Sequence, residues 1–228
     1  MKKLLALMLL LCLCCTCAMS EGSLEIIETR VVRRVEEDYA QMKAFLKVTN
    51  AGDAPVSLNE GTVRYTDAQG ALVDESFTYS MFPTVLQPGE AGYMYIWSYG
   101  IEVDAAKSIA DYDIVLQPEH SYLPGITPID YTAEYVVNDY EYYKEYNVIV
   151  TVTNNSENVV WEPQILVVVR AQNGKILDMT DTTMYGVGIP AGSSVHYVVS
   201  LSEYDVDNWT AAGYEVAEIE TIIYEETK

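Results

Sequence analysis

The sequence lacks most of the residues from which metal centres and nucleophilic active sites are built. Its cysteines are confined to the N-terminal segment, at Cys12, Cys14, Cys15 and Cys17, and its two histidines are His120 and His196. It contains no HExxH, Gly-x-Gly-x-x-Gly, Walker or Gly-x-Ser-x-Gly motif. We therefore expect no zinc site, no nucleotide cofactor and no Ser-His-Asp triad, and we assign structural roles to both histidines.

Positive charge is also scarce. The 228 residues include 34 Asp and Glu against 13 Lys and Arg, which gives a formal charge of −21 and a pI of about 4.2. Nucleic-acid binding needs a basic face, so this balance excludes a nucleic-acid partner. Half of the residues are hydrophobic, however, which is typical of a globular protein and too many for an acidic disordered tail.

Long apolar runs are absent except at the N-terminus. Lys2 and Lys3 precede an apolar stretch over residues 4–13, and Ala18-Met19-Ser20 supplies small residues before Glu21. This pattern predicts a signal peptide over 1–20, cleaved before Glu21, and thus an extracellular or cell-surface protein; a buried N-terminal helix is the alternative. No later run reaches the length of a membrane-spanning helix, so none is expected in the mature chain.

A lipoprotein anchor is the other interpretation of this segment. It would require acylation of Cys17 or Cys15, but the residues preceding both cysteines fit the lipoprotein motif poorly, which favours ordinary cleavage. Cleavage before Glu21 leaves a chain without cysteine, so neither a disulfide nor a thiolate metal site is expected. Loss of Lys2 and Lys3 changes the formal charge from −21 to −23.

The remaining chain repeats itself at an offset of 104 residues. Between positions 31 and 74 the offset gives ten identities in 44 positions, including Val48-Thr49-Asn50 on Val152-Thr153-Asn154 and Gly70 on Gly174. Three prolines and a glycine lie between the copies, over 117–128. We therefore predict a domain over 21–118, a proline-rich linker over 119–128 and a second domain over 129–228.

Each copy has the period-two pattern of short β-strands. Val148, Val150 and Val152 alternate with Ile149, Thr151 and Thr153, for example. The predicted strands are 44–49, 62–66, 71–79, 91–98 and 112–116 in the first copy, and 148–153, 164–171, 175–182, 193–201 and 217–224 in the second. A short helix or a loop is expected over 103–110 and over 206–212. The fold class predicted is all-β, with two tandem immunoglobulin-like β-sandwich domains after the signal peptide; a small β-barrel is the alternative.

Several turn motifs resemble one domain family. They are Val152-Thr153-Asn154-Asn155-Ser156, Gly174-Lys175-Ile176-Leu177 and Ile189-Pro190-Ala191-Gly192-Ser193, with Tyr65-Thr66-Asp67 before Gly70 in the first copy. These are similar to FxLYD-type domains of bacterial envelope proteins, although the second copy has Val169-Arg170-Ala171-Gln172 there, with neither Tyr nor Asp. The resemblance implies an Ig-like, non-catalytic extracellular module, and it brings no functional residues with it.

Acidic residues offer the only material for catalysis or metal binding. A carboxylate pair would suit a secreted hydrolase, which is the alternative function. However, Asp104 and Asp207 are equivalent in the two copies, as are Asp74 and Asp178, and a catalytic residue is seldom duplicated with its domain. Calcium is a second use for carboxylates, but Asp111-Tyr112-Asp113 and Asp205-Val206-Asp207 lack EF-hand spacing. We predict no catalytic, cofactor or metal residues, and we interpret the charge as a solvated surface.

Tyrosine is the residue in excess, with 19 of the 25 aromatics. Six tyrosines crowd the first hairpin of the second copy, and the candidates for a binding surface are Tyr140, Tyr142, Tyr143 and Tyr146. Sheet surface and core are the alternative roles. A run of five apolar residues over 165–169 indicates an interface or a central strand. The function predicted is a non-catalytic exported bacterial module that binds an envelope protein or glycan, or acts as a spacer at the cell envelope.

Overall fold

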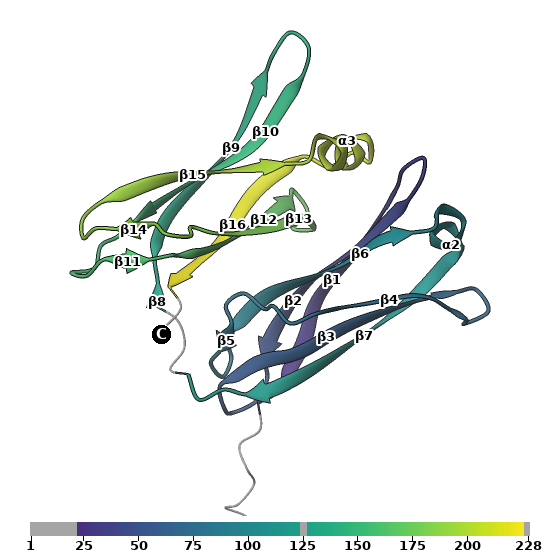
Figure 1. Ribbon diagram of the computed structural model, residues 1–228, viewed down its shortest axis with the longest axis horizontal. Helices are drawn as coiled ribbons and strands as arrows, with labels where there is room; N and C mark the ends of the chain where they lie inside the picture. Colours follow the sequence, from purple (N-terminus) through teal and green to yellow (C-terminus); the bar gives the residue numbers. More distant parts are fainter. Residues whose placement is uncertain (1–21, 124–126, 226–228) are drawn as a thin grey trace, which may run out of the picture.

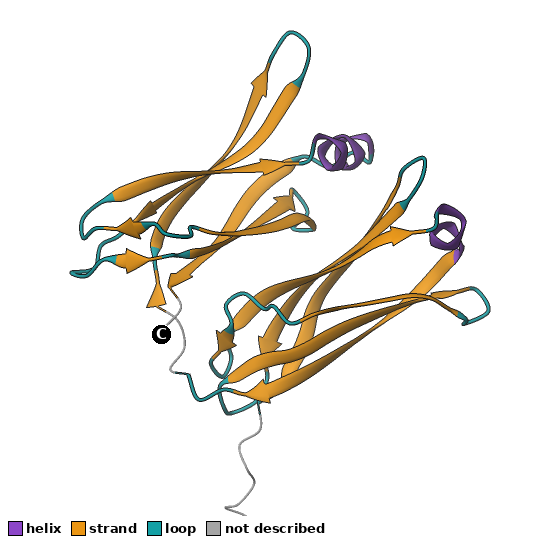
Figure 2. Ribbon diagram, in the orientation of Figure 1, coloured by secondary structure: helices purple, strands orange, loops and turns teal. Residues whose placement is uncertain are grey.

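The computed structural model describes residues 22–123 and 127–225, and in these the chain is built from antiparallel β-sheets with two short helices (Figures 1 and 2). The predicted signal peptide, with all four cysteines, lies outside the described residues. The architecture fits the predicted all-β class and a β-sandwich.

Two sheets form the N-terminal half. One has the order β1-β2-β6, and the other contains β4, β3 and β5, with β7 also paired to β3. Their bounds are β1 Leu24–Val35, β2 Ala40–Asn50, β3 Val56–Asp67, β4 Leu72–Thr78, β5 Val85–Leu86, β6 Ala91–Ile101 and β7 Ile109–His120, with helix α2 at Val103–Ser108. Alternate residues of β2, such as Ala44, Leu46 and Val48, are fully buried between the sheets, as the pattern predicts.

The C-terminal half has corresponding sheets. One has the order β15-β10-β9, another has β13-β12-β16-β8, and β11 pairs with β14. The bounds are β8 Thr127–Pro128, β9 Asp130–Asp139, β10 Lys144–Thr153, β11 Val160–Trp161, β12 Gln164–Ala171, β13 Ile176–Thr183, β14 Gly188–Ile189, β15 Ser194–Leu201 and β16 Val216–Glu225, with helix α3 at Glu203–Ala211. Val148, Val150 and Val152 of β10 point into its core.

A buried asparagine at the end of a strand makes the same set of hydrogen bonds in each half, and we call this arrangement the corner. The Asn50 side chain donates to the carbonyls of Ala54 and Leu86 (2.8 and 2.9 Å) and accepts from the Gly52 amide. Asn154 donates to the carbonyls of Asn158 and Ile189 (both 2.7 Å) and accepts from the Ser156 amide. The partners occupy equivalent positions, so the repeated Val-Thr-Asn sequence has the same structural role twice.

Most predicted strands coincide with observed ones. The predicted strands did not include β1, β9 or the two-residue strands β5, β8, β11 and β14. Strand β1 was not predicted, because a β-bulge between Ile26 and Glu28 shifts its register and breaks the alternation. The stretch 119–128, predicted as a linker, begins and ends in strands, since β7 continues to His120 and Thr127–Pro128 pair with β16. The two helical segments are α2 and α3.

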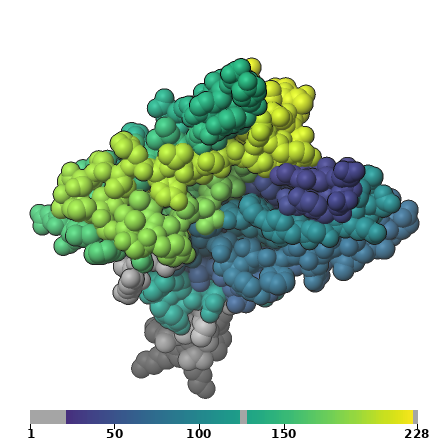
Figure 3. Space-filling model, turned by 45° about the horizontal axis from the view of Figure 1, so that its top comes forward, coloured from purple at the N-terminus to yellow at the C-terminus, as the bar shows by residue number. Residues whose placement is uncertain are grey.

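The two halves pack face to face (Figure 3). The outer face of β1-β2-β6 contacts the outer face of β13-β12-β16, and the contact has its own apolar cluster of Phe45, Phe82, Tyr93, Leu166, Val168, Ile176, Met179 and Tyr224. The apolar run of β12 serves both sides: Ile165, Val167 and Val169 enter the core of the C-terminal half, whereas Leu166 and Val168 enter this contact. We call the contact between these two faces the seam.

Candidate functional sites: the tyrosine hairpin and the seam

The first candidate site is the tip of the β9–β10 hairpin, which projects beyond the body of the C-terminal half (Figure 1). The turn is closed by the Tyr140 amide donating to the Tyr143 carbonyl at 2.9 Å. The rings of these two tyrosines stack with centroids 4.7 Å apart and planes at 25°. Tyr142 is 88% exposed, Tyr143 52% and Tyr140 47%. Three aromatic rings are therefore presented to solvent, and two of them are held by mutual stacking.

Tyr146, the fourth predicted residue, does not join this tip. It is partly buried against the core of the C-terminal half. Tyr135 packs there too, and the Tyr131 hydroxyl accepts a hydrogen bond from the Thr221 amide at 3.3 Å. The cluster seen in the sequence thus divides into an exposed tip and a structural base.

Negative charge surrounds the tip. Asp139 and Lys144 form an ion pair of 3.3 Å at its base, and Glu141 and Glu145 flank the tyrosines. The nearby carboxylate of Glu145 raises the pKa of Tyr140, since a phenolate there would meet like charge. The tip combines aromatic area with net negative charge, a surface suited to stacking, cation–π contacts and hydrogen bonds.

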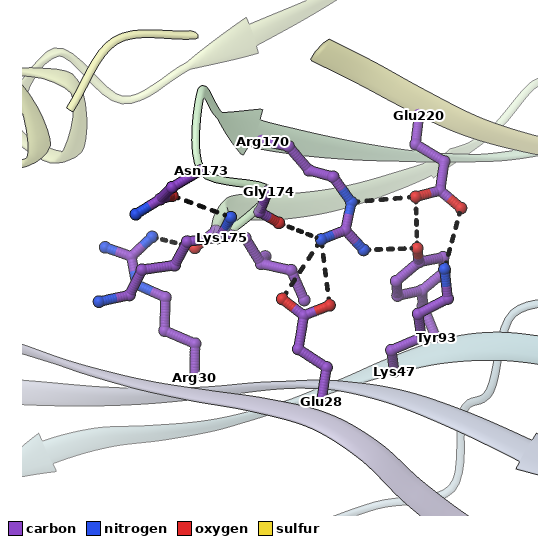
Figure 4. Close-up of polar contacts among 10 residues, drawn as sticks. Glu28, Arg30, Lys47, Tyr93, Arg170, Asn173, Gly174, Lys175 and Glu220 are labelled. Atoms are coloured by element: carbon purple, nitrogen blue, oxygen red, sulfur yellow. Dashed lines mark hydrogen bonds and ion pairs between the residues drawn. The ribbon is translucent and has the colours of Figure 1, made fainter. Parts of the chain in front are cut away.

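The second candidate site is the seam, where charged residues surround the apolar cluster. Arg170 of β12 is its centre, with a side chain only 8% exposed (Figure 4). Its Nη1 lies 3.0 Å from Glu28 Oε2, its Nε 3.1 Å from Glu220 Oε2, and its Nη2 donates to the Tyr93 hydroxyl at 2.7 Å. Nη1 also donates to the Gly174 carbonyl at 2.6 Å.

This network is balanced. Burial opposes the charge on Arg170, but its hydrogen bonds with Tyr93, Glu220 and Glu28 prevail and raise its pKa. Glu28 and Tyr93 belong to the N-terminal half, whereas Glu220 and Gly174 belong to the C-terminal half. A single guanidinium therefore binds groups from both halves.

Lys43 of β2 is a second basic residue that forms ion pairs across the seam. Its Nζ lies 2.8 Å from Asp205 and 4.0 Å from Asp178, and 5.0 Å from the centre of the Trp97 ring. Burial raises the pKa of Asp178 to about 6; Lys43 opposes the increase and Asp205 adds to it. The Tyr95 hydroxyl donates to Asp181, and Lys47 pairs with Glu220 at 3.7 Å.

A cavity of about 230 Å³ lies beside Lys43, between the halves. Its charged lining consists of Arg30, Arg33, Arg34 and Lys43 from the N-terminal half and Asp178 and Asp205 from the other, with Asn208 and Trp209 of α3. The two carboxylates would be the pair for a hydrolase, but both contact the Lys43 ammonium, which occupies space that hydrolysis would need for water or a sugar oxygen.

The other acidic and imidazole candidates do not converge on a site. His120 contacts Tyr122 edge to face, and His196 hydrogen-bonds Thr151 across β15 and β10. Asp104 forms an ion pair within α2 with Lys107. Over residues 22–123 and 127–225, no group of three or more His, Cys, Asp or Glu side chains could hold a metal ion.

The seam was not predicted as a site, although two sequence signals point to it. One is the apolar run over 165–169, whose two faces both need partners. The other is the concentration of positive charge on β1 and β2, which carry half of the ten Lys and Arg residues that the structure describes: Arg30, Arg33, Arg34, Lys43 and Lys47. Neither signal says which surface is the partner.

Comparison with known proteins adds little. No protein-family model matches the chain, and no curated protein matches it in sequence. Among solved structures it is similar to a red sea bream transglutaminase, with a TM-score of 0.24 and 8% identity, over 78% of this chain. The matched region spans 27% of the transglutaminase. In the described part of the chain, no helix is long and apolar enough to cross a membrane.

Proposed function

We propose that the protein is an exported, non-catalytic binding module of the bacterial cell envelope, built from two tandem Ig-like domains of the FxLYD type. Three observations support two domains: the sequence offset of 104 residues, the recurrence of one strand order, and the matching corners at Asn50 and Asn154. Each half has its own buried core. The signal-like segment supports export.

The contact surface proposed is the tip formed by Tyr140, Tyr142 and Tyr143, and its ligand is an envelope protein or glycan. The observation that carries this proposal is the stacked, exposed pair Tyr140–Tyr143 beside the freely exposed Tyr142. Tyrosine offers a large contact area at low entropic cost, and the stacking restricts two of the rings before a ligand arrives. The seam supports the same function by fixing the hairpin relative to the N-terminal half.

A hydrolase has less support. Two cavities are lined by a pair of carboxylates. Asp178 and Asp205 share Lys43, and a buried ammonium held by two carboxylates is a structural arrangement rather than a reactive one. In the other cavity, Asp130 accepts a hydrogen bond from the Asn155 side chain and Glu225 accepts one from the Trp161 amide.

The test is binding of the mature chain to cell-wall fractions. The triple variant Tyr140→Ser, Tyr142→Ser, Tyr143→Ser removes the tip. The double variant Tyr122→Ser, Tyr185→Ser is the control, because it removes two highly exposed tyrosines elsewhere on the surface. We expect the triple variant to lose most of the binding and the control to keep it, with unfolding temperatures unchanged. Equal binding by the parent and a folded triple variant would exclude the tip as the contact surface.

A further inference from the structure

Arg30 is a guanidinium in the seam without a direct counter-charge. It extends from β1 and donates to the Ile176 carbonyl (Figure 4). No carboxylate among the described residues lies within ion-pair distance of it. Burial lowers its pKa, and the more distant Tyr214, Asp178 and Asp205 oppose this only in part. Desolvating a cation without pairing it costs free energy, so this position is favourable for an anion.

Arg34, four residues further along the same face of β1, also has an unused donor. Its Nη2 pairs with Glu36, and its guanidinium stacks over the Tyr204 ring at 4.1 Å. Its Nε is buried and has no hydrogen-bond partner. Nη1 of Arg33 donates a hydrogen bond to the Ala106 carbonyl at 3.0 Å. All three arginines line the 230 Å³ cavity. The guanidinium groups of Arg30 and Arg34 lie on the same face of β1, and guanidinium groups are well suited to recognise a carboxylate or a phosphate.

The acidic residues of the cavity do not fill this role. Asp205 is held by Lys43 at 2.8 Å, and the buried Asp178 accepts from the Met179 amide and faces the same lysine. Both carboxylates thus lie beside Lys43, whereas no carboxylate among the described residues lies within ion-pair distance of Arg30. A water molecule occupies roughly 30 Å³, so the cavity has room for a phosphate or a small carboxylate, but not for a polymer.

We propose that the seam cavity binds a small oxyanion, a carboxylate or a phosphate, through Arg30 with Arg33 and Arg34 of β1. Asn208 of α3 also lines this cavity and carries a side-chain amide. Ligand sites occur preferentially where two packed units meet. Because the ligand contacts both halves, its binding tightens the seam. This proposal is independent of the tyrosine hairpin, since the two sites share no residue.

The experiment is a titration of the mature chain with inorganic phosphate and, separately, with acetate, each against sodium chloride at constant ionic strength. Calorimetry measures the affinity for each anion, and comparison of the two titrations shows whether the site prefers a phosphate or a carboxylate. Amide chemical shifts locate the site. We expect saturable binding of at least one anion, with shifts concentrated over residues 30–34 of β1 and 208–211 of α3. Shifts that are scattered, or that do not saturate, would overturn the proposal.

Arg30→Gln removes the unpaired cation. It is expected to weaken binding by about tenfold or more, as loss of a charged hydrogen-bonding fork should. The control is Arg64→Gln, which removes an exposed arginine of β3 that is paired with Glu75 of β4, and should leave the affinity within about twofold. Equal affinity of Arg30→Gln and the parent would contradict the proposal. If Arg30→Gln does not fold, the shift map of the parent protein decides by itself.

Discussion

The outer faces of β1-β2-β6 and β9-β10-β15 occupy equivalent places in the two halves, yet only the first packs against the other half. Phe45 and Lys43 on the first correspond to Ile149 and Asn147 on the second, at the offset of 104 residues. On the neighbouring strand Tyr95 corresponds to Val198, which is 55% exposed. The strand order is the same in both, so the side chains of the face determine which sheet is docked.

The partner face shows the same difference. Leu166, Val168 and Arg170 of β12 contact the opposite half, whereas Thr62 and Arg64 of β3, at equivalent positions, do not. Arg64 instead forms an exposed ion pair with Glu75 on its own sheet. Each half thus has one adhesive face, and the adhesive faces are on different sheets. The contact is heterologous, because different sheets of the two halves meet in it.

The largest effect is expected when a residue of the β12 face in the seam is replaced by the residue at the equivalent position of β3. Val168→Arg, which copies Arg64, places an unpaired charge in the apolar cluster of the seam and should destabilise the docked arrangement by more than about 3 kcal/mol. Small-angle scattering should then report a larger radius of gyration, while circular dichroism keeps the β-sheet signal.

The matched control is Arg64→Val, the exchange in the opposite direction. Its ion pair is exposed, so stability should change by less than about 1 kcal/mol and the radius of gyration should not change. If Val168→Arg left the scattering curve unchanged, the seam would not be what holds the halves together.

Arg170→Met is the next largest change. It leaves Glu28, Glu220 and the Tyr93 hydroxyl without their shared partner, and should cost roughly 3 kcal/mol, because breaking a buried ion pair strands the remaining charges. Adding Glu28→Gln and Glu220→Gln removes those charges and should recover part of the loss. Equilibrium unfolding in urea measures both. A triple variant less stable than Arg170→Met would contradict this explanation.

Asn50→Ala and Asn154→Ala compare the two corners. Each side chain makes three hydrogen bonds with backbone groups, so each variant should lose roughly 2 kcal/mol. If the halves are separate domains, Asn50→Ala should lower the free energy of unfolding of the N-terminal half, and Asn154→Ala should lower that of the C-terminal half. Hydrogen exchange followed residue by residue resolves the two. Equal loss of protection in both halves for either variant would argue for one cooperative unit.

Asp178→Asn should stabilise the protein, and only at neutral pH. The pKa of Asp178 in the folded state, about 6, is above its ordinary value near 4, so the group contributes stability below pH 4 that is lost as the pH rises through 6. The variant cannot ionise. The free energy of unfolding of the variant should equal that of the parent near pH 4. Above pH 6 it should be larger, by an amount on the order of 1–2 kcal/mol.

Urea unfolding of both proteins between pH 4 and 7.5 measures this difference. A difference that does not vary with pH, or a variant less stable than the parent above pH 6, would show that ionised Asp178 gains more from Lys43 than it loses by burial.

The sequence predicts local structure well where one face of a strand is buried. Val148, Val150 and Val152 gave the position of β10, and β12 has the predicted bounds of 164–171. The exposed tip of the hairpin was also found from its tyrosines. By contrast, β1 was missed because its bulge shifts the alternation and its outer face carries Glu28, Arg30 and Arg34.

The seam could not be derived from the sequence, for a physical reason. Arg170 meets Glu28 across 142 residues and Glu220 across 50, and no local pattern encodes such distant contacts. A charged residue on a strand has the same appearance whether it faces water, as Arg64 does, or a second half of the molecule, as Arg170 does. Only the packing of one face against another distinguishes them.

The fixed docking of the two halves can be measured as a distance. Residues 21–228 contain no cysteine, so Gln69→Cys in the N-terminal half and Glu157→Cys in the C-terminal half introduce a unique pair of exposed labelling sites. Double electron–electron resonance between spin labels at these sites should give a single narrow distance distribution, which broadens when Val168→Arg is added. A broad distribution in the protein without Val168→Arg would contradict a fixed seam.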